Sequence, residues 1–289
     1  MKLRITAIIT VLIFCLVFTT ACQYSPLEDP SILYKSDNVE VSLIENTNKN
    51  QHVDYEWVAL TDDVAYTKNT VIVTGTVFNV RQATVAYEYM DTDVVDNITI
   101  FDVEISDVLA CRSGSFKQGD TITMGIGYNM NHYSEELSII ENGKTYLMFC
   151  YVAADDKGDV LELSEYVDCW ISAPKDLFLE KTGDNYLSID YFSDVPGSVQ
   201  LADCLSLTEE QITSLSNVNN IDNTDDIISS IYEEINTTNA KYAAEALIVL
   251  KNRTITHPAE FYNLIERSYL INCEELEEYI RNTALLYDN

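Results

Sequence analysis

The chain has 289 residues, of which 17 are Lys or Arg and 47 are Asp or Glu, so its formal net charge at pH 7 is −30. A surface of that sign repels phosphate backbones, which argues against nucleic acid as a partner. Hydrophobic residues make up 47% of the chain and aromatic residues 10%, a composition of folded proteins rather than of disordered acidic tails.

The N-terminus predicts a secretory signal peptide at residues 1–21. Lys2 and Arg4 precede an apolar stretch over residues 5–18, and small residues follow it. This stretch is shorter than the roughly 20 residues that cross a bilayer core, so a permanent transmembrane helix is not expected.

A cysteine stands directly after this segment. The run Thr19-Thr20-Ala21-Cys22 resembles the lipobox of bacterial lipoproteins, although that motif usually has leucine in place of Thr19. The resemblance implies that Cys22 is the lipid-attachment residue and that the protein is anchored on the extracytoplasmic face of the bacterial cell membrane. Ordinary signal-peptide cleavage after Ala21 is the alternative.

Residues 22–55 are expected to form the lipid anchor and a tether. Prolines at positions 26 and 30 and a polar stretch after them are typical of a linker that holds a folded body off a membrane. In the alternative, the stretch "NVEVSLIE" is a first strand that docks on the body.

From about residue 70 the chain reads as a series of β-strands. In the stretch 98–109, Phe101, Val103 and Ile105 face one way, while Asp102 faces the other. Gly75 lies inside the first strand and indicates a bulge or a sharp bend. The expected strands cover residues 70–80, 98–109, 120–130, 144–153 and 160–171, with turns at Asn142-Gly143 and, in a later hairpin-like stretch, at Gly183.

This series of strands resembles the OB-fold barrel shared by tissue inhibitors of metalloproteinases and netrin modules. The segments that carry the likeness are 73–77, 101–105, 119–122 and 143–149, within a match over roughly residues 56–172. The resemblance implies a small antiparallel β-barrel, which we assign to residues 56–192. It does not imply protease inhibition, because those inhibitors chelate zinc through an N-terminal cysteine and no cysteine lies between Cys22 and Cys111.

After residue 192 the spacing of apolar residues changes from that of strands to that of helices, which predicts a linker at 193–206 and an α-helical domain at 207–289. Capping boxes stand at Thr208 with Gln211 and at Asn272 with Glu275, and His257 precedes Pro258 as at a helix start. The helices are expected within residues 225–235, 239–252, 257–270 and 274–287. The predicted fold class is therefore α+β, an OB-like barrel followed by helices.

Five cysteines remain once Cys15 leaves with the signal and Cys22 is lipidated. They are Cys111, Cys150, Cys169, Cys204 and Cys273. An odd number leaves at least one of them unpaired, and the sequence does not say which pair. The alternative is that most of them are buried as small hydrophobic residues.

No motif for catalysis, metal or cofactor is recognised. The chain lacks G-x-S-x-G, H-E-x-x-H and C-x-x-C, and His132 has acids nearby but no second histidine. The acidic segments 91–96 and 222–226 lack the glycine and distal glutamate of a calcium loop. We therefore expect no metal and no cofactor, and an enzyme is the less favoured class.

The segment "TVAYEYM" supplies the candidate ligand-binding residues, Tyr87 and Tyr89. They share one face of an expected strand, where aromatic rings can stack on a sugar or a peptide. The sequence favours packing in the core over ligand binding for these tyrosines, and it favours core packing for Trp57 and Trp170 as well. The sequence thus predicts a membrane-anchored binding or interaction module, with an envelope peptide, glycan or protein as partner. The alternatives are a cell-envelope hydrolase and a structural accessory subunit of an envelope complex.

Overall fold

The computed structural model describes most of the region between Ser31 and Leu205 and a C-terminal segment. The described residues are 31–44, 60–89, 92–127, 140–153, 161–171, 173–205, 242, 245–246, 248–249 and 264–287. The predicted signal peptide, Cys22 and most of the predicted helical domain lie outside them. So do His52, Trp57, Asp91, His132, Thr208 and His257.

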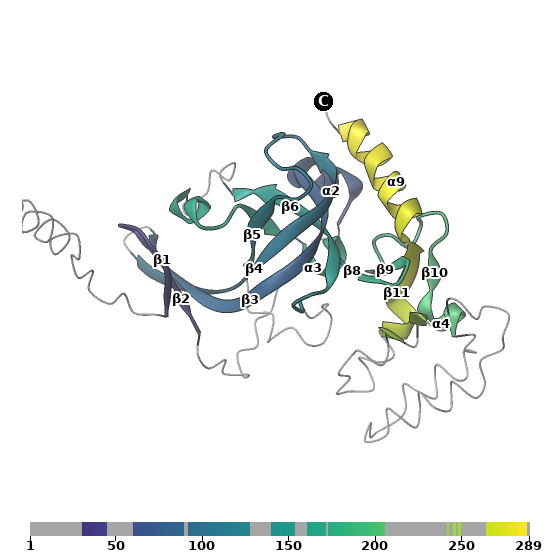
Figure 1. Cartoon of the computed structure of the whole chain (residues 1–289), viewed down its shortest axis with the longest axis horizontal. Helices are drawn as coiled ribbons and strands as arrows, with labels where there is room; N and C mark the ends of the chain where they lie inside the picture. Colours follow the sequence, from purple (N-terminus) through teal and green to yellow (C-terminus); the bar gives the residue numbers. More distant parts are fainter. Residues whose placement is uncertain are drawn as a thin grey trace, which may run out of the picture.

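The described strands form one mixed sheet of eleven strands (Figure 1). Their order is β1-β2-β3-β4-β5-β7-β6-β8-β9-β11-β10, and neighbours are antiparallel except β5 and β7, which are parallel. The strands are β1 (Ile32–Lys35), β2 (Val39–Leu43), β3 (Val71–Tyr89), β4 (Thr92–Cys111), β5 (Thr121–Ile126), β6 (Thr145–Val152), β7 (Cys169–Ile171), β8 (Phe178–Thr182), β9 (Asn185–Ile189), β10 (Val199–Gln200) and β11 (Ser268–Asn272).

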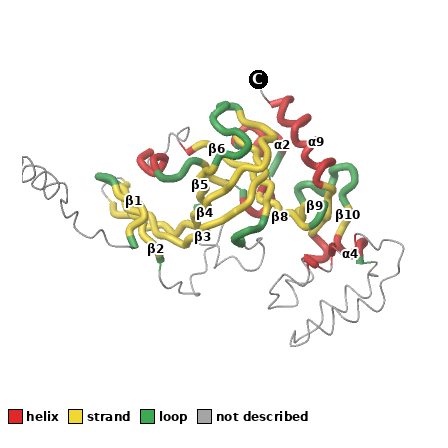
Figure 2. The backbone as a smooth tube through the Cα atoms, viewed as in Figure 1, coloured by secondary structure: helices red, strands yellow, loops and turns green. Residues whose placement is uncertain are grey.

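Short helices flank this sheet (Figure 2). They include α2 (Asp62–Lys68), α3 (Pro174–Leu177), α4 (Leu201–Cys204) and α9 (Cys273–Ala284), with single 3₁₀ turns at η3 (Leu161–Glu165) and η5 (Leu285–Tyr287). None of the helices in the described part of the chain is long and apolar enough to cross a membrane.

The sheet is organised by the long hairpin of β3 and β4. The pairing register of these strands shifts at three places, one of them between Thr74 and Gly75, so the bulge expected at Gly75 is confirmed. A further shift between Phe78 and Arg81 goes with a positive φ of 55° at Asn79. Because bulges bend strands and increase their twist, the hairpin curves along its length (Figure 1).

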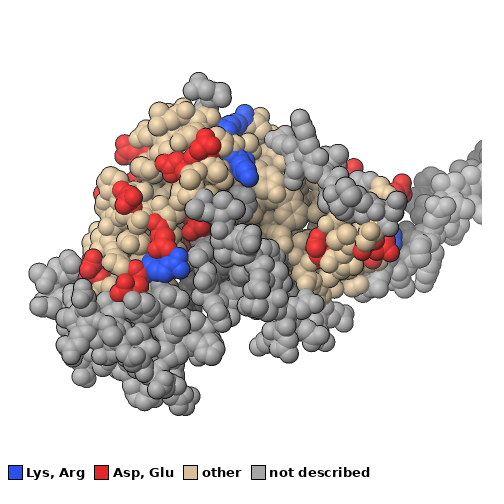
Figure 3. Space-filling model, turned by 180° about the vertical axis from the view of Figure 1, so that it is seen from behind, with Lys and Arg blue, Asp and Glu red and all other residues tan. Residues whose placement is uncertain are grey.

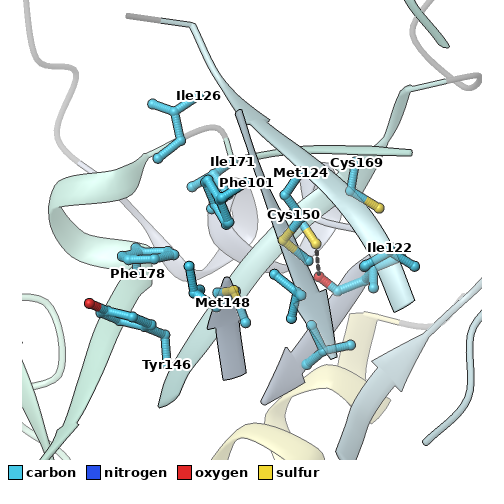
Figure 4. Packing of buried hydrophobic residues seen from close by; sticks show 14 of the residues in the cluster. Phe101, Ile122, Met124, Ile126, Tyr146, Met148, Cys150, Cys169, Ile171 and Phe178 are labelled. Carbon is cyan, nitrogen blue, oxygen red and sulfur yellow. Dashed lines mark hydrogen bonds between the residues drawn. The ribbon is translucent and has the colours of Figure 1, made fainter. Parts of the chain in front are cut away.

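The first half of β3 and the second half of β4 belong to a closed circuit of hydrogen-bonded neighbours. β3 pairs with β4, β4 with β5, β5 with β7, β7 with β6, and β6 pairs again with β3. The predicted alternation in residues 98–109 is observed: Phe101, Val103 and Ile105 belong to the core inside the circuit and are fully or almost fully buried. Figure 4 shows Phe101 in this core.

The predicted fold class, a small antiparallel OB-like barrel followed by a helical domain, is wrong. The sheet does not end with the circuit, because β8 continues along the edge of β6 that β7 only partly covers, and β9, β11 and β10 follow. A strand of eight residues leaves backbone donors and acceptors open beside a three-residue neighbour, and β8 satisfies them.

A helical C-terminal domain is not seen in the described residues either. Ser268–Asn272, placed by the sequence pattern at the end of one predicted helix and the start of the next, is strand β11 and pairs with all five residues of β9. Likewise, residues 160–171 were expected as one strand but contain the 3₁₀ turn η3 and the short β7. The domain boundary at residues 193–206 stays a prediction. β9 precedes this segment in the chain and β11 follows it, and the two strands pair with each other.

Several local signals are confirmed. Asn272 caps α9, its side chain accepting hydrogen bonds from the backbone amides of Glu274 and Glu275. Gly143 and Gly183 adopt positive φ in the expected turns. In the segment predicted as tether, residues 39–43 form β2, so the alternative in which "NVEVSLIE" supplies a strand describes this part of the chain.

Candidate functional site

The outer side of the β3–β4 hairpin carries a small hydrophobic cluster separate from the core of the circuit. It gathers buried residues of β2, β3 and β4 and two residues from η3 and the turn after it. The buried members are Val39, Val41, Ala83, Val85, Ile98, Ile100, Leu163 and Val167. Apolar side chains on both faces of this hairpin explain why η3 packs here: it covers a surface that would otherwise be exposed to water.

Four half-buried aromatic residues pack around this cluster, namely Tyr34, Tyr87, Tyr166 and Trp170. We call this surface, together with Arg81 and Asp102 beside it, the aromatic face. The rings of Tyr34 and Tyr166 stack with centroids 5.6 Å apart, and the Tyr34 hydroxyl donates to Glu165 Oε2 over 2.9 Å. Residues distant in the sequence are therefore joined into one surface.

Trp170 lies against the backbone of β5. It pairs with Gly125 across the parallel β5–β7 neighbours, and a Cβ atom built on Gly125 would come within 2.4 Å of the indole ring. Because glycine has no Cβ atom, the ring can lie directly against the strand, and Trp170 is held at the margin of the face.

Polar side chains form the centre of the aromatic face. Asp102 accepts hydrogen bonds from Arg81 Nη2 at 2.8 Å, from Asn79 Nδ2 at 2.7 Å and from Thr123 Oγ1 at 3.1 Å. The bulge between Phe78 and Arg81 brings both Asn79 and Arg81 to this carboxylate. The side chains of Arg81 and Asp102 are only 19% and 16% exposed, so this ion pair is largely desolvated.

Arg81 also links the polar centre to the aromatic rings. Its Nη1 donates to the Tyr166 hydroxyl over 3.3 Å, while its Nε is buried and has no hydrogen-bond partner among the described residues. Burial raises the pKa of Tyr166, Asp102 raises it further, and Arg81 opposes both. Tyr166 therefore keeps its proton at neutral pH, and that proton has no acceptor in the described part of the chain.

The residues predicted from sequence are only partly described. Tyr87 lies at the rim of the aromatic face, half-buried, and its hydroxyl donates to Asp96 Oδ2 over 2.7 Å. Val85, on the same face, is 2% exposed and belongs to the cluster beneath. Tyr89 ends β3, and its side chain lies outside the description. Their role in binding stays a prediction.

Sequence reasoning missed Arg81, Tyr34 and Tyr166, and assigned Trp170 to core packing. Only Asp102 had a visible signal, because the alternation of residues 98–109 placed it on the outer side. The bulge shifts Arg81 out of simple alternation, and Tyr166 was expected in a strand rather than beside η3.

The charge of the molecule is spread over its surface. On the side drawn in Figure 3, acidic side chains are more widely distributed than basic ones, in keeping with the net charge of −30. Within the described ranges, no group of three or more His, Cys, Asp or Glu residues could hold a metal ion.

Comparisons of this chain with models of protein families, with curated proteins and with solved structures find no match. The features of the molecule that bear on its function are therefore the aromatic face and the N-terminal sequence.

Proposed function

We propose that this protein is a membrane-anchored extracytoplasmic lipoprotein whose aromatic face binds a neutral glycan of the cell envelope. Cys22 is the anchor and residues 1–21 are the export signal. The observation that carries the binding site is the largely buried pair of Arg81 and Asp102 on the outer side of the sheet, beside half-buried aromatic rings. Neither residue of this pair belongs to the hydrophobic core inside the circuit.

The chemistry of the face suits a neutral, polyhydroxylated ligand. Aromatic side chains offer flat apolar surfaces with polar edges, and the faces of sugar rings are apolar enough to stack on them. Hydroxyl groups of a sugar would find the Tyr166 proton and the Asp102 oxygens as oriented partners. Arg81 and Asp102 neutralise each other, so the centre of the face has no net charge to select a charged ligand. The carboxylates that accept from Tyr34 and Tyr87 at its rim disfavour an anion.

Binding is tested by co-sedimentation of the full-length protein, in detergent, with insoluble bacterial cell-wall glycan. Trp170→Ala should raise the dissociation constant about ten-fold, because it removes a stacking surface worth about 1.4 kcal/mol. Tyr166→Phe keeps the ring and removes only the hydroxyl, and should raise it about three-fold. Tyr87→Ala should have a smaller effect in the same direction.

Tyr269→Ala is the matched control, since Tyr269 is a half-buried tyrosine of β11 that packs against a different cluster. It should bind like the wild type, and a soluble neutral oligosaccharide should compete with all forms. Unchanged binding by folded Trp170→Ala would place the site elsewhere. Binding to oligolysine and not to glycan would assign the module to a cationic peptide partner instead.

The anchor is tested separately by metabolic labelling with a fatty acid. Wild-type protein should incorporate the label and sediment with membranes, whereas Cys22→Ser should lose the label and leave the membrane fraction. Cys15→Ser is the control: Cys15 lies within the predicted signal peptide, so this variant should be labelled normally. Equal labelling of Cys22→Ser and wild type would rule out lipidation at this residue without affecting the glycan test.

A further inference from the structure

The five described cysteines are all free thiols, and four of them are buried. Cys204 belongs to the cluster around α4, and Cys273 to the cluster around α9. Cys111, Cys150 and Cys169 share the core inside the circuit of β3 to β7. A disulfide between the first two and any of the last three would therefore need a rearrangement of the core.

Within the group of three, only one pair lies on directly neighbouring strands. Cys111 and Cys150 both stand opposite Val71, one on each side of β3, so a whole strand separates them. In the antiparallel pair of β6 and β7, Cys150 stands opposite Ile171 and Cys169 opposite Val152. Cys150 and Cys169 are thus diagonal neighbours, and both side chains point into the same core (Figure 4).

We propose that Cys150 and Cys169 form a disulfide when the protein folds in the presence of an oxidising disulfide. Diagonal neighbours on antiparallel strands lie about 7 to 8 Å apart, slightly beyond the Cα spacings of about 4.4 to 6.8 Å that disulfides span, so closing the bond draws the ends of β6 and β7 together. The curvature of the circuit favours this movement, because it brings inward side chains closer together. Both thiols are buried in the same core cluster, where Cys150 Sγ donates to Val71 O over 3.4 Å (dashed in Figure 4).

The reaction is thiol–disulfide exchange with a small-molecule disulfide. The thiolate of one cysteine attacks a sulfur of the external disulfide, forms a mixed disulfide and releases one thiolate. The thiolate of the second cysteine then attacks the protein sulfur of the mixed disulfide, which closes the Cys150–Cys169 bond and releases the second thiolate. The two protons of the protein thiols are taken up by the two released thiolates, and the external disulfide is reduced.

The folded protein protects both thiols from this reaction. Both side chains are 0% exposed, and the neighbouring Cys169 thiol, followed by burial, raises the pKa of the Cys150 thiol. Oxidation is therefore expected during folding, before the core closes. Cys111 differs: although burial opposes it, hydrogen bonds with Ser113 and with backbone amides lower the pKa of its partly exposed thiol. It is the thiol that a reagent should modify in the native state.

The bond would close the segment of chain between β6 and β7. That segment carries η3 and Tyr166, which cover the outer cluster. The disulfide would restrict the chain from residue 150 to residue 169 in the unfolded state and so lower the entropy of that state. This should raise the melting temperature by about 5 to 10 °C. This inference does not depend on the ligand or on the lipid anchor.

The experiment refolds the full-length protein with oxidised or with reduced glutathione, blocks free thiols and digests the protein without reduction. We expect a cross-linked peptide pair containing Cys150 and Cys169 only after oxidative refolding. Dithiothreitol should lower the melting temperature of oxidatively refolded wild type, and should leave Cys150→Ala and Cys169→Ala unchanged. Cys204→Ala, which alters a buried cysteine of another cluster, should respond to dithiothreitol like the wild type.

Two results would overturn the proposal. One is recovery of Cys150 and Cys169 as free thiols from protein that has refolded with oxidised glutathione. The other is a linkage of either residue to Cys111 in place of the proposed pair. Both readouts come from the wild-type protein, so the test does not depend on whether the alanine variants fold.

Discussion

Gly75→Ala should lower the free energy of unfolding by about 3 kcal/mol, because there is no room for a methyl group between β3 and β4. A Cβ atom on Gly75 would lie 2.4 Å from Val103 Cγ1 and 2.7 Å from the backbone oxygen of Glu104. The side chain can rotate, but the backbone oxygen belongs to the paired strand, and moving it disturbs the bulge that bends the hairpin. Urea unfolding followed by circular dichroism measures the loss.

Gly127→Ala is the matched control for this variant. None of the described residues comes within 4 Å of a Cβ built on Gly127, which stands just after β5. Its stability should stay within about 0.5 kcal/mol of wild type. If Gly75→Ala were as stable as Gly127→Ala, the close approach of β3 and β4 at the bulge would be refuted.

Arg81→Met should lower the free energy of unfolding by about 2 kcal/mol. The substitution keeps the length of the side chain but leaves the Asp102 carboxylate largely buried without its cation, which is more costly than losing an exposed ion pair. Asn79 and Thr123 still donate to this carboxylate, so the loss is less than for a fully isolated charge. Asp102→Asn, which retains an acceptor oxygen, completes a double-mutant cycle.

The cycle isolates the coupling between the two charges. Arg81→Met in the Asp102→Asn background should cost about 1 kcal/mol less than in wild type, since no buried charge is then left unpaired. Lys35→Met is the control, because Lys35 and Glu40 form a 2.5 Å pair whose side chains are 62% and 37% exposed. That variant should change stability by less than about 0.5 kcal/mol. Strict additivity in the cycle would show that Arg81 and Asp102 act independently.

The candidate site was visible in the sequence only where it follows simple alternation. Asp102 stands between Phe101 and Val103 in a strictly alternating stretch, so its outward direction could be predicted. Arg81 follows a bulge that sets two residues of β3 against one of β4, and no local rule says where such an extra residue is inserted. Trp170 comes to the face because β7 pairs with β5, where Gly125 leaves room for the indole ring, and Tyr166 lies between η3 and β7.

The sequence by itself determined the local features: the presence of β3, β4, β5 and β6, the direction of the side chains in residues 101–105, the bulge at Gly75 and the cap at Asn272. These depend on residues adjacent along the chain. Tertiary structure alone decided that Ser268–Asn272 is a strand and that the sheet runs on past β6 to β10. The physical reason is that an open strand edge must find hydrogen-bond partners wherever the chain can supply them, and such an edge exists only after the rest of the sheet has formed.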